Sequence, residues 1–161
     1  MKGDKKVLDY LNRALRAELT AITQYWLHGR LQEDWGLGRM SAKSLAESEE
    51  ERGHANRLIG RILLLGGVPD MQTLDPLRVG ASARETLECD LKGEEDAIAL
   101  YTEAREVCEK AGDYVSKNLF EDLLADEQGH ADFLETQIDL HDRMGAERYN
   151  ELNASPIAEA A

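Results

Sequence analysis

The sequence repeats a short phrase, ERGHA at residues 51–55 and EQGHA at residues 127–131, and the repetition extends beyond the phrase. When the chain is aligned with itself at an offset of 76 residues, each Glu and His of one phrase meets its counterpart in the other. The same offset aligns Glu18 with Glu94. We therefore expect two matched halves, each of which supplies one Glu and one Glu-x-x-His phrase.

The apolar residues around these positions follow the spacing of a helix. Steps of four and three residues place side chains on one buried stripe, and a Glu interrupts each stripe. The two stripes are Leu11, Leu15, Glu18, Ile22, Tyr25 and Leu87, Leu91, Glu94, Ile98, Tyr101. In each phrase, Glu and His lie one turn apart on one face. The pattern predicts that six polar residues face the core: Glu18, Glu51, His54, Glu94, Glu127 and His130.

Four long helical patterns divide the chain, at about 5–33, 38–65, 82–111 and 113–144. Asp4, Ser82 and Asp113 are candidate N-caps, and Ser82 with Glu85 has the spacing of a capping box. Gly66, with a proline nearby, marks the end of the second pattern. The tail that follows residue 145 is expected to contain one short helix.

The connection between the second and third helices is long, at residues 66–81. Fully extended, it would span roughly 50 Å, whereas a helix of this length measures about 42 Å. The other connections are short and favour antiparallel hairpins. The sequence therefore predicts an all-α fold in a single domain of residues 1–161. That fold is a ferritin-like four-helix bundle with one long crossover and a short C-terminal fifth helix.

A bundle core does not tolerate four unpaired carboxylates, because each buried charge costs several kcal/mol. Four carboxylates and two neutral imidazoles carry about −4, which two divalent cations would neutralise. One Glu from each of two helices, with Glu-x-x-His from each of the other two, is the ligand set of di-iron and di-manganese bundles. A single Glu-x-x-His is usually a solvated pair, but two copies in register with two further Glu favour a paired metal centre.

The composition of the chain limits the kinds of partner that it can bind. The net charge of −13 disfavours a nucleic-acid partner and is compatible with cation binding or with solubility alone. No segment is long and apolar enough for a membrane span or a secretion signal, so we expect no membrane partner and a cytoplasmic protein. Cys89 and Cys108 would lie about 28 Å apart on one helix, which excludes a disulfide between them.

At these residues the chain resembles the bacterioferritins. The resemblance spans nearly the whole chain, through MKGDKKVLDYLN, QYWLHGRLQEDWGL, RILLLGGVP, the two phrases, GDYVSKNLF and LNASP. It implies a shell of twenty-four subunits, built of dimers, that stores iron. It also implies two non-haem Fe ions per subunit and the oxidation of Fe(II) by O2 or H2O2.

The resemblance assigns roles to the six residues. Glu51 and Glu127 would bridge the two ions, Glu18 with His54 would complete one, and Glu94 with His130 the other. Tyr25, two turns after Glu18, is open to two interpretations: a hydrogen-bond donor or electron source at the site, or a packed core residue.

Bacterioferritins usually also bind haem b at the two-fold interface, through one Met from each subunit. Here Arg52 stands at that position, and a protonated guanidinium has no lone pair to donate. Trp26, Leu19 and Ile22 could still line an apolar interface pocket. Three outcomes stay open: no haem, haem held without Met, or a shell mixed with a second subunit that keeps the Met. We expect no normally ligated haem in this chain alone.

Other polar residues lie outside the repeat. His28 and His141 are expected at an interface or on the surface. Asp132 and Asp139 are candidates for a cation pore, and Glu121 and Asp122 for attracting iron, although solvated helix faces explain all four. Two competing functions are a di-iron oxidase that stores nothing and a haem-poor subunit of a mixed shell.

Overall fold

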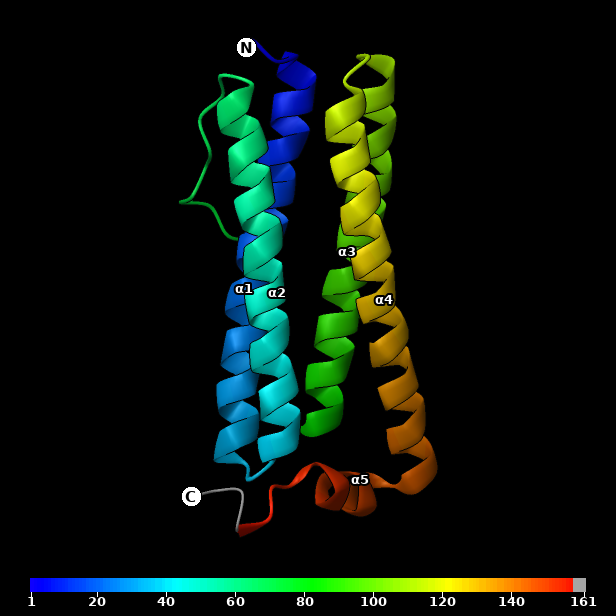
Figure 1. Cartoon of the computed structure of the whole chain (residues 1–161). Helices are drawn as coiled ribbons and strands as arrows, with labels where there is room; N and C mark the ends of the chain where they lie inside the picture. The colour runs from blue at the N-terminus through cyan, green and yellow to red at the C-terminus, as the bar shows by residue number, and fades with distance from the viewer. Residues whose placement is uncertain (158–161) are drawn as a thin grey trace.

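In the computed structural model, which describes residues 1–157, five helices and no strand are found (Figure 1). The helices are α1 (Lys5–Asp34), α2 (Gly38–Leu64), α3 (Ala83–Lys110), α4 (Tyr114–Met144) and α5 (Ala146–Asn153). Residues 158–161 of the predicted tail lie outside the described range. The predicted four-helix bundle, with its long crossover and short fifth helix, is confirmed.

Helices α1 and α2 form one hairpin, and α3 and α4 form a second. The short connections within the two hairpins are alike, as are their helices. Gly36 after α1 and Gly112 after α3 have φ of +84° and +72°, and they are again 76 residues apart. Glycine takes this left-handed conformation without a Cβ clash, so each helix can end in a tight turn. The helices then return antiparallel, and each packs most extensively against its hairpin partner.

Three of the four bundle helices begin at the predicted side-chain caps. Asp4 accepts hydrogen bonds from the backbone of α1, Ser82 from α3 and Asp113 from α4. The capping box at Ser82 is modified, because the carboxylate of Glu85 accepts from Ala81 N rather than from Ser82 N. No helix in the described residues is long and apolar enough to cross a membrane.

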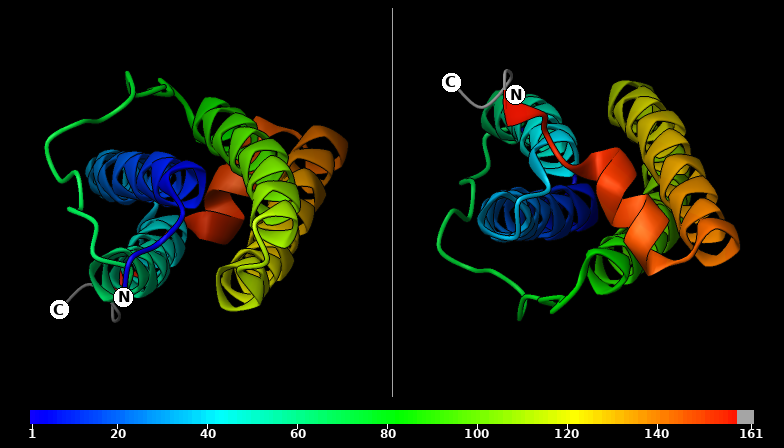
Figure 2. Two further views of the ribbon diagram at one scale, coloured as in Figure 1. Left: turned by 90° about the horizontal axis from the view of Figure 1, so that it is seen from above. Right: turned by 90° about the horizontal axis from the view of Figure 1, so that it is seen from below.

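The crossover between α2 and α3 runs along the outside of α1, as the end views show (Figure 2). It is held by a row of polar side chains on α1 that recur every four residues: Asn12, Arg16, Thr20, Gln24 and His28. One face of α1 therefore points to the core and a neighbouring face to the crossover. These contacts fix the crossover along the outside of α1.

The expectation for His28 was wrong. Its side chain is fully buried, where Nε2 accepts a hydrogen bond from Gly80 N and Nδ1 donates to Asp90. A Cβ at Gly80 would lie 2.4 Å from Thr86 N, so only glycine permits this approach of the crossover to α3. His28 thus joins α1, α3 and the end of the crossover.

Two apolar clusters fill the bundle at different levels. The larger includes Leu11, Leu15, Leu58 and Phe120, and the smaller includes Met40 and Tyr149 of α5. Helix α5 crosses the end of the bundle and buries Tyr149 against the smaller cluster (Figure 1). Along α2, α3 and α4, the predicted ligand residues lie in sequence between the two clusters, so the bundle has a polar middle with apolar packing on both sides.

Candidate metal centre

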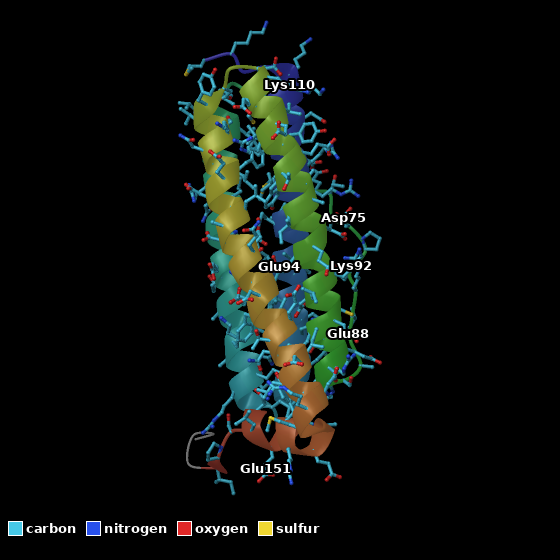
Figure 3. The ribbon with its side chains drawn as sticks, turned by 90° about the vertical axis from the view of Figure 1, so that its right-hand side faces the viewer. Asp75, Glu88, Lys92, Glu94, Lys110 and Glu151 are labelled. Carbon is cyan, nitrogen blue, oxygen red and sulfur yellow. The ribbon has the colours of Figure 1, made fainter. Side chains whose placement is uncertain are left out.

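The structure brings all six predicted residues together in the polar middle of the bundle. They come from four helices: Glu18 from α1, Glu51 and His54 from α2, Glu94 from α3, and Glu127 and His130 from α4. Their relative exposures lie between 1% and 8%, so all six side chains are buried. Glu94 lies about midway along α3 (Figure 3). The helical spacing alone is sufficient to place these side chains inside.

The six side chains form two overlapping groups. In each group, one N or O atom per residue lies within 4.8 Å of the corresponding atom of every other member. One group comprises Glu18, Glu51, His54 and Glu127, and the other Glu51, Glu94, Glu127 and His130. Both groups contain Glu51 and Glu127. The arrangement therefore offers two adjacent cation positions with two shared carboxylates.

Each of the six residues has a buried polar atom without a hydrogen-bond partner in residues 1–157. These atoms are Glu18 Oε2, Glu51 Oε1, His54 Nδ1, Glu94 Oε2, Glu127 Oε1 and His130 Nδ1. Buried polar atoms are almost always paired, and a cluster of unpaired ones requires an explanation. Carboxylate oxygens and imidazole nitrogens are suitable ligands for Fe or Mn. The donor set and its unpaired atoms fit two metal ions.

Two tyrosines hold the terminal carboxylates. Tyr25 on α1 donates a hydrogen bond to Glu94 Oε1 on α3, with 2.6 Å between the oxygens. Tyr101 on α3 donates in the opposite direction, to Glu18 Oε1 on α1. Both tyrosines are buried, and each leaves the second oxygen of its Glu unpaired. Tyr25 is thus a hydrogen-bond donor at the site, and Tyr101 is an equivalent donor that the repeat could have indicated.

Both histidines present Nδ1 to the centre and Nε2 away from it. His54 Nδ1 lies 3.0 Å from Glu127 Oε1, and His130 Nδ1 lies 3.3 Å from Glu51 Oε1. The two rings are nearly parallel, with centroids 6.3 Å apart. The outward nitrogen of each ring meets carboxylates, as metal-binding histidines commonly do. These outer acids are Asp126 beside His54, and Glu47 and Glu50 beside His130.

Sequence reasoning missed these outer acids. Glu50 and Asp126 are 76 residues apart, so the repeat contained a signal for them, whereas Glu47 has no acidic counterpart. Asp90, which binds His28 and Gln24, was also missed. Burial raises its pKa, although its hydrogen bond with His28 acts against this.

Burial and the proximity of the carboxyl groups to one another shift their pKa values in the metal-free protein. Burial raises the pKa of Glu51 well above its usual value, and the nearby Glu18 raises it further. Burial, together with contact with the carboxyl group of Glu94, raises the pKa of Glu127 to about 9. Burial acts in the same direction on Glu94, but its contacts with Glu127 and His130 outweigh it and lower its pKa. The pKa values of Glu94 and Glu127 are therefore shifted in opposite directions.

The histidines take up protons for the same electrostatic reason. Burial alone would lower the pKa of His54, but contacts with Glu127 and Glu18 raise it to about 11. For His130, burial is likewise outweighed, by Glu94 above all, and the pKa rises to about 10. Without metal, protons supply part of the positive charge that the carboxylates require.

A cavity of about 690 Å³ connects the centre with the crossover. Its lining includes Glu18, Glu94 and Tyr25 on the inside, and Arg16, Asp75 and Arg78 at the crossover. Arg16 forms an ion pair with Asp75, and Arg78 with Asp96. Asp75 lies on the crossover beside the bundle (Figure 3). The cavity therefore extends from the crossover to the carboxylates of the centre.

The other residues singled out in the sequence lie away from the centre. Trp26 and Arg52 are exposed, and Leu19 and Ile22 are partly buried against the larger apolar cluster. Asp132, Asp139 and Asp122 are exposed and Glu121 is partly so, which leaves their proposed roles untested. His141 is partly buried and packs edge-on against Tyr149.

Comparison with known proteins places the chain among proteins with the same architecture. The ferritin-like domain family matches residues 8–144. The bacterioferritin of Rhodobacter capsulatus is 62% identical over 98% of both chains, and that of Brucella melitensis is 58% identical over 99% of both. The chain belongs to the bacterioferritin family.

A solved structure of Rhodobacter capsulatus bacterioferritin superposes with a TM-score of 0.97 over 98% of both chains. That protein has a metal-free dinuclear site and holds haem iron in a crystallographic special position. Because the match covers nearly the whole of both chains, the shared bacterioferritin fold includes the crossover and α5.

Proposed function

We propose that this chain is an iron-storage ferroxidase that oxidises Fe(II) with O2 or H2O2 at the six-residue centre. The observation that carries the proposal is the pair of overlapping donor groups, buried and rich in unpaired atoms, that share Glu51 and Glu127. A buried cluster of carboxylates is tolerable when cations neutralise it. Membership of the bacterioferritin family supports iron storage.

The donor groups suggest a role for each residue. Glu51 and Glu127 belong to both groups and would bridge two iron ions, with Glu18 and His54 completing one position and Glu94 and His130 the other. Two Fe(II) ions supply two electrons, which with two protons reduce O2 to H2O2, or H2O2 to two molecules of water. Carboxylate ligands favour the ferric product because they supply negative charge.

The remaining residues would hold the donors in place. Tyr25 and Tyr101 each bind one oxygen of a terminal Glu and leave the other for a metal ion. The acids that contact His54 and His130 at Nε2 direct Nδ1 inward. Fe(II) and the oxidant would enter through the cavity beside the crossover.

The product would be stored as ferric mineral in a shell of twenty-four subunits, assembled from dimers. The proposal places this shell in the cytoplasm, where free thiols such as Cys89 and Cys108 stay reduced. The second candidate, a di-iron oxidase that stores nothing, is favoured by the cavity, which has room for more than an iron ion.

Haem is a separate question. The haem iron of the Rhodobacter capsulatus protein makes an interface haem a candidate here, but Arg52 is exposed and has no lone pair for iron. We propose that a shell of this chain alone contains no Met-ligated haem. A shell mixed with a Met-containing subunit is the alternative that Arg52 favours.

Size-exclusion chromatography after aerobic iron loading tests storage. Twenty-four chains of 18.0 kDa would elute near roughly 430 kDa, and ferric iron should co-elute with this peak. A monomer or dimer that oxidises Fe(II) but retains no iron would instead favour the non-storage oxidase. A shell that oxidises Fe(II) no faster than buffer would indicate a non-catalytic subunit.

A further inference from the structure

The repeat is broken at one position behind the centre. At the offset of 76 residues, Glu47 on α2 aligns with Leu123 on α4. Leu123 is fully buried in the larger apolar cluster, and Glu47 is also buried, at 6% exposure. One half of the bundle therefore contains a buried carboxylate where the other half contains a methyl-bearing side chain. A buried carboxylate is retained only where specific partners offset its desolvation.

Glu47 lies between a lysine and a candidate metal ligand. Its Oε1 is 2.7 Å from Lys43 Nζ, which also lies over the ring of Phe133. Its Oε2 is 3.0 Å from His130 Nε2. Glu47 Oε2 and His130 Nε2 are both buried, and neither atom has a hydrogen bond of good geometry among residues 1–157. A proton on Nε2 that is directed to Glu47 would satisfy both atoms, and it would leave Nδ1 of His130 with a lone pair for metal.

The matching histidine is held differently. His54 Nε2 forms a hydrogen bond of 2.9 Å with Asp126, whose side chain is about half exposed. His130 also has an exposed neighbour, Glu50, at 3.1 Å. What distinguishes His130 is the additional, buried carboxylate of Glu47, which water does not screen. The two cation positions therefore have the same types of ligand, but different carboxylates contact the outer nitrogen of each histidine.

We propose that Glu47 is a positioning residue for His130, and that its influence is confined to the metal position formed by Glu94 and His130. Asp126 has the corresponding role for the position formed by Glu18 and His54. This inference rests on the proposed metal centre. Carboxylates that bind the outer nitrogen of a metal-bound histidine fix its orientation and raise its basicity, and their loss commonly lowers metal affinity about 10–100-fold.

The test uses Co(II) as the probe and measures each position separately. Crystals of the assembled protein are soaked with less Co(II) than the sites can hold, and anomalous diffraction gives the occupancy at both positions. Glu47→Leu copies the residue that the chain itself uses at position 123. The measured quantity is the Co(II) occupancy of the His130 position divided by that of the His54 position. We expect Glu47→Leu to lower this ratio by about tenfold relative to the parent. Asp126→Ala should shift the same ratio in the opposite direction.

Glu47→Gln keeps the size and an accepting oxygen but removes the charge, so it should shift the ratio in the direction of Glu47→Leu by a smaller factor. It also carries the test if the Leu variant does not assemble. An equal loss at both positions, or an unchanged ratio in the variant that assembles, would overturn the role of Glu47. If the parent bound no Co(II) at either position, the proposed metal centre itself would fail.

Discussion

Tyr25 on α1 donates a hydrogen bond to Glu94 on α3, across the interior of the bundle, at 2.6 Å. Because Tyr25 and Tyr101 each reach from one hairpin to a carboxylate of the other, the hydrogen bonds at the centre also join the two hairpins. The centre and the bundle are thus stabilised by the same contacts.

Tyr25→Phe should destabilise the metal-free protein, because a buried carboxylate oxygen loses its donor. The expected loss in the free energy of unfolding is about 1–3 kcal/mol, measured by denaturant unfolding. Tyr10→Phe is the matched control, since Tyr10 is also buried on α1 and its ring lies against Arg13. Equal losses in the two variants would show that the contact with Glu94 adds nothing.

Glu51→Gln should separate stability from metal binding. Burial, and next the neighbouring Glu18, raise the pKa of Glu51 well above its usual value, so the charged form is disfavoured in the metal-free protein and an uncharged amide should be tolerated there. We expect the Tm of the metal-free variant to equal or exceed that of the parent. The rise in Tm on adding Co(II) should shrink, because a shared ligand is lost. The exposed Glu49→Gln is the control, and a full Co(II)-induced rise in Glu51→Gln would count against a bridging role.

The metal-free protein should lose stability as pH rises. The folded pKa values of His54 and His130, about 11 and about 10, exceed the ordinary value of 6.5, so the folded state binds more protons. Their contribution is complete below pH 6.5 and is lost as pH rises towards 10–11. Glu127, raised from 4.5 to about 9, acts in the same direction at lower pH.

Unfolding of the metal-free protein at pH 6, 8 and 9.5 measures this dependence. Metal ions compete with the same protons, so Co(II) affinity should increase over this range and its binding should release protons. Stability that increased from pH 6 to pH 9.5 would contradict the protonated metal-free centre.

Arg52→Met should permit haem binding in a shell of this chain alone. The variant supplies a thioether at an exposed position of α2, and haem reconstitution followed by absorption spectroscopy would detect bis-Met ligation. Arg52→Leu is the control for hydrophobicity without a ligand atom. If the parent and both variants bound haem equally, Arg52 would not determine haem ligation.

Much of this arrangement could be predicted from local periodicity. Helical steps around Glu18 and Glu94 placed them in the core, and the repeat related His54 to His130. His28 was misassigned because its partners, Asp90 and Gly80, are more than fifty residues away, and the four-residue spacing of polar side chains on α1 does not identify them. Glu47 was missed because it departs from the repeat.

The central claim is that the six buried residues form a paired cation site, and anaerobic titration of the metal-free protein with Fe(II) tests it most directly. The account predicts that two Fe(II) ions bind tightly per chain in the parent and that tight binding is lost when Glu18→Ala and Glu94→Ala are combined. Equal binding by the parent and the double variant would contradict it.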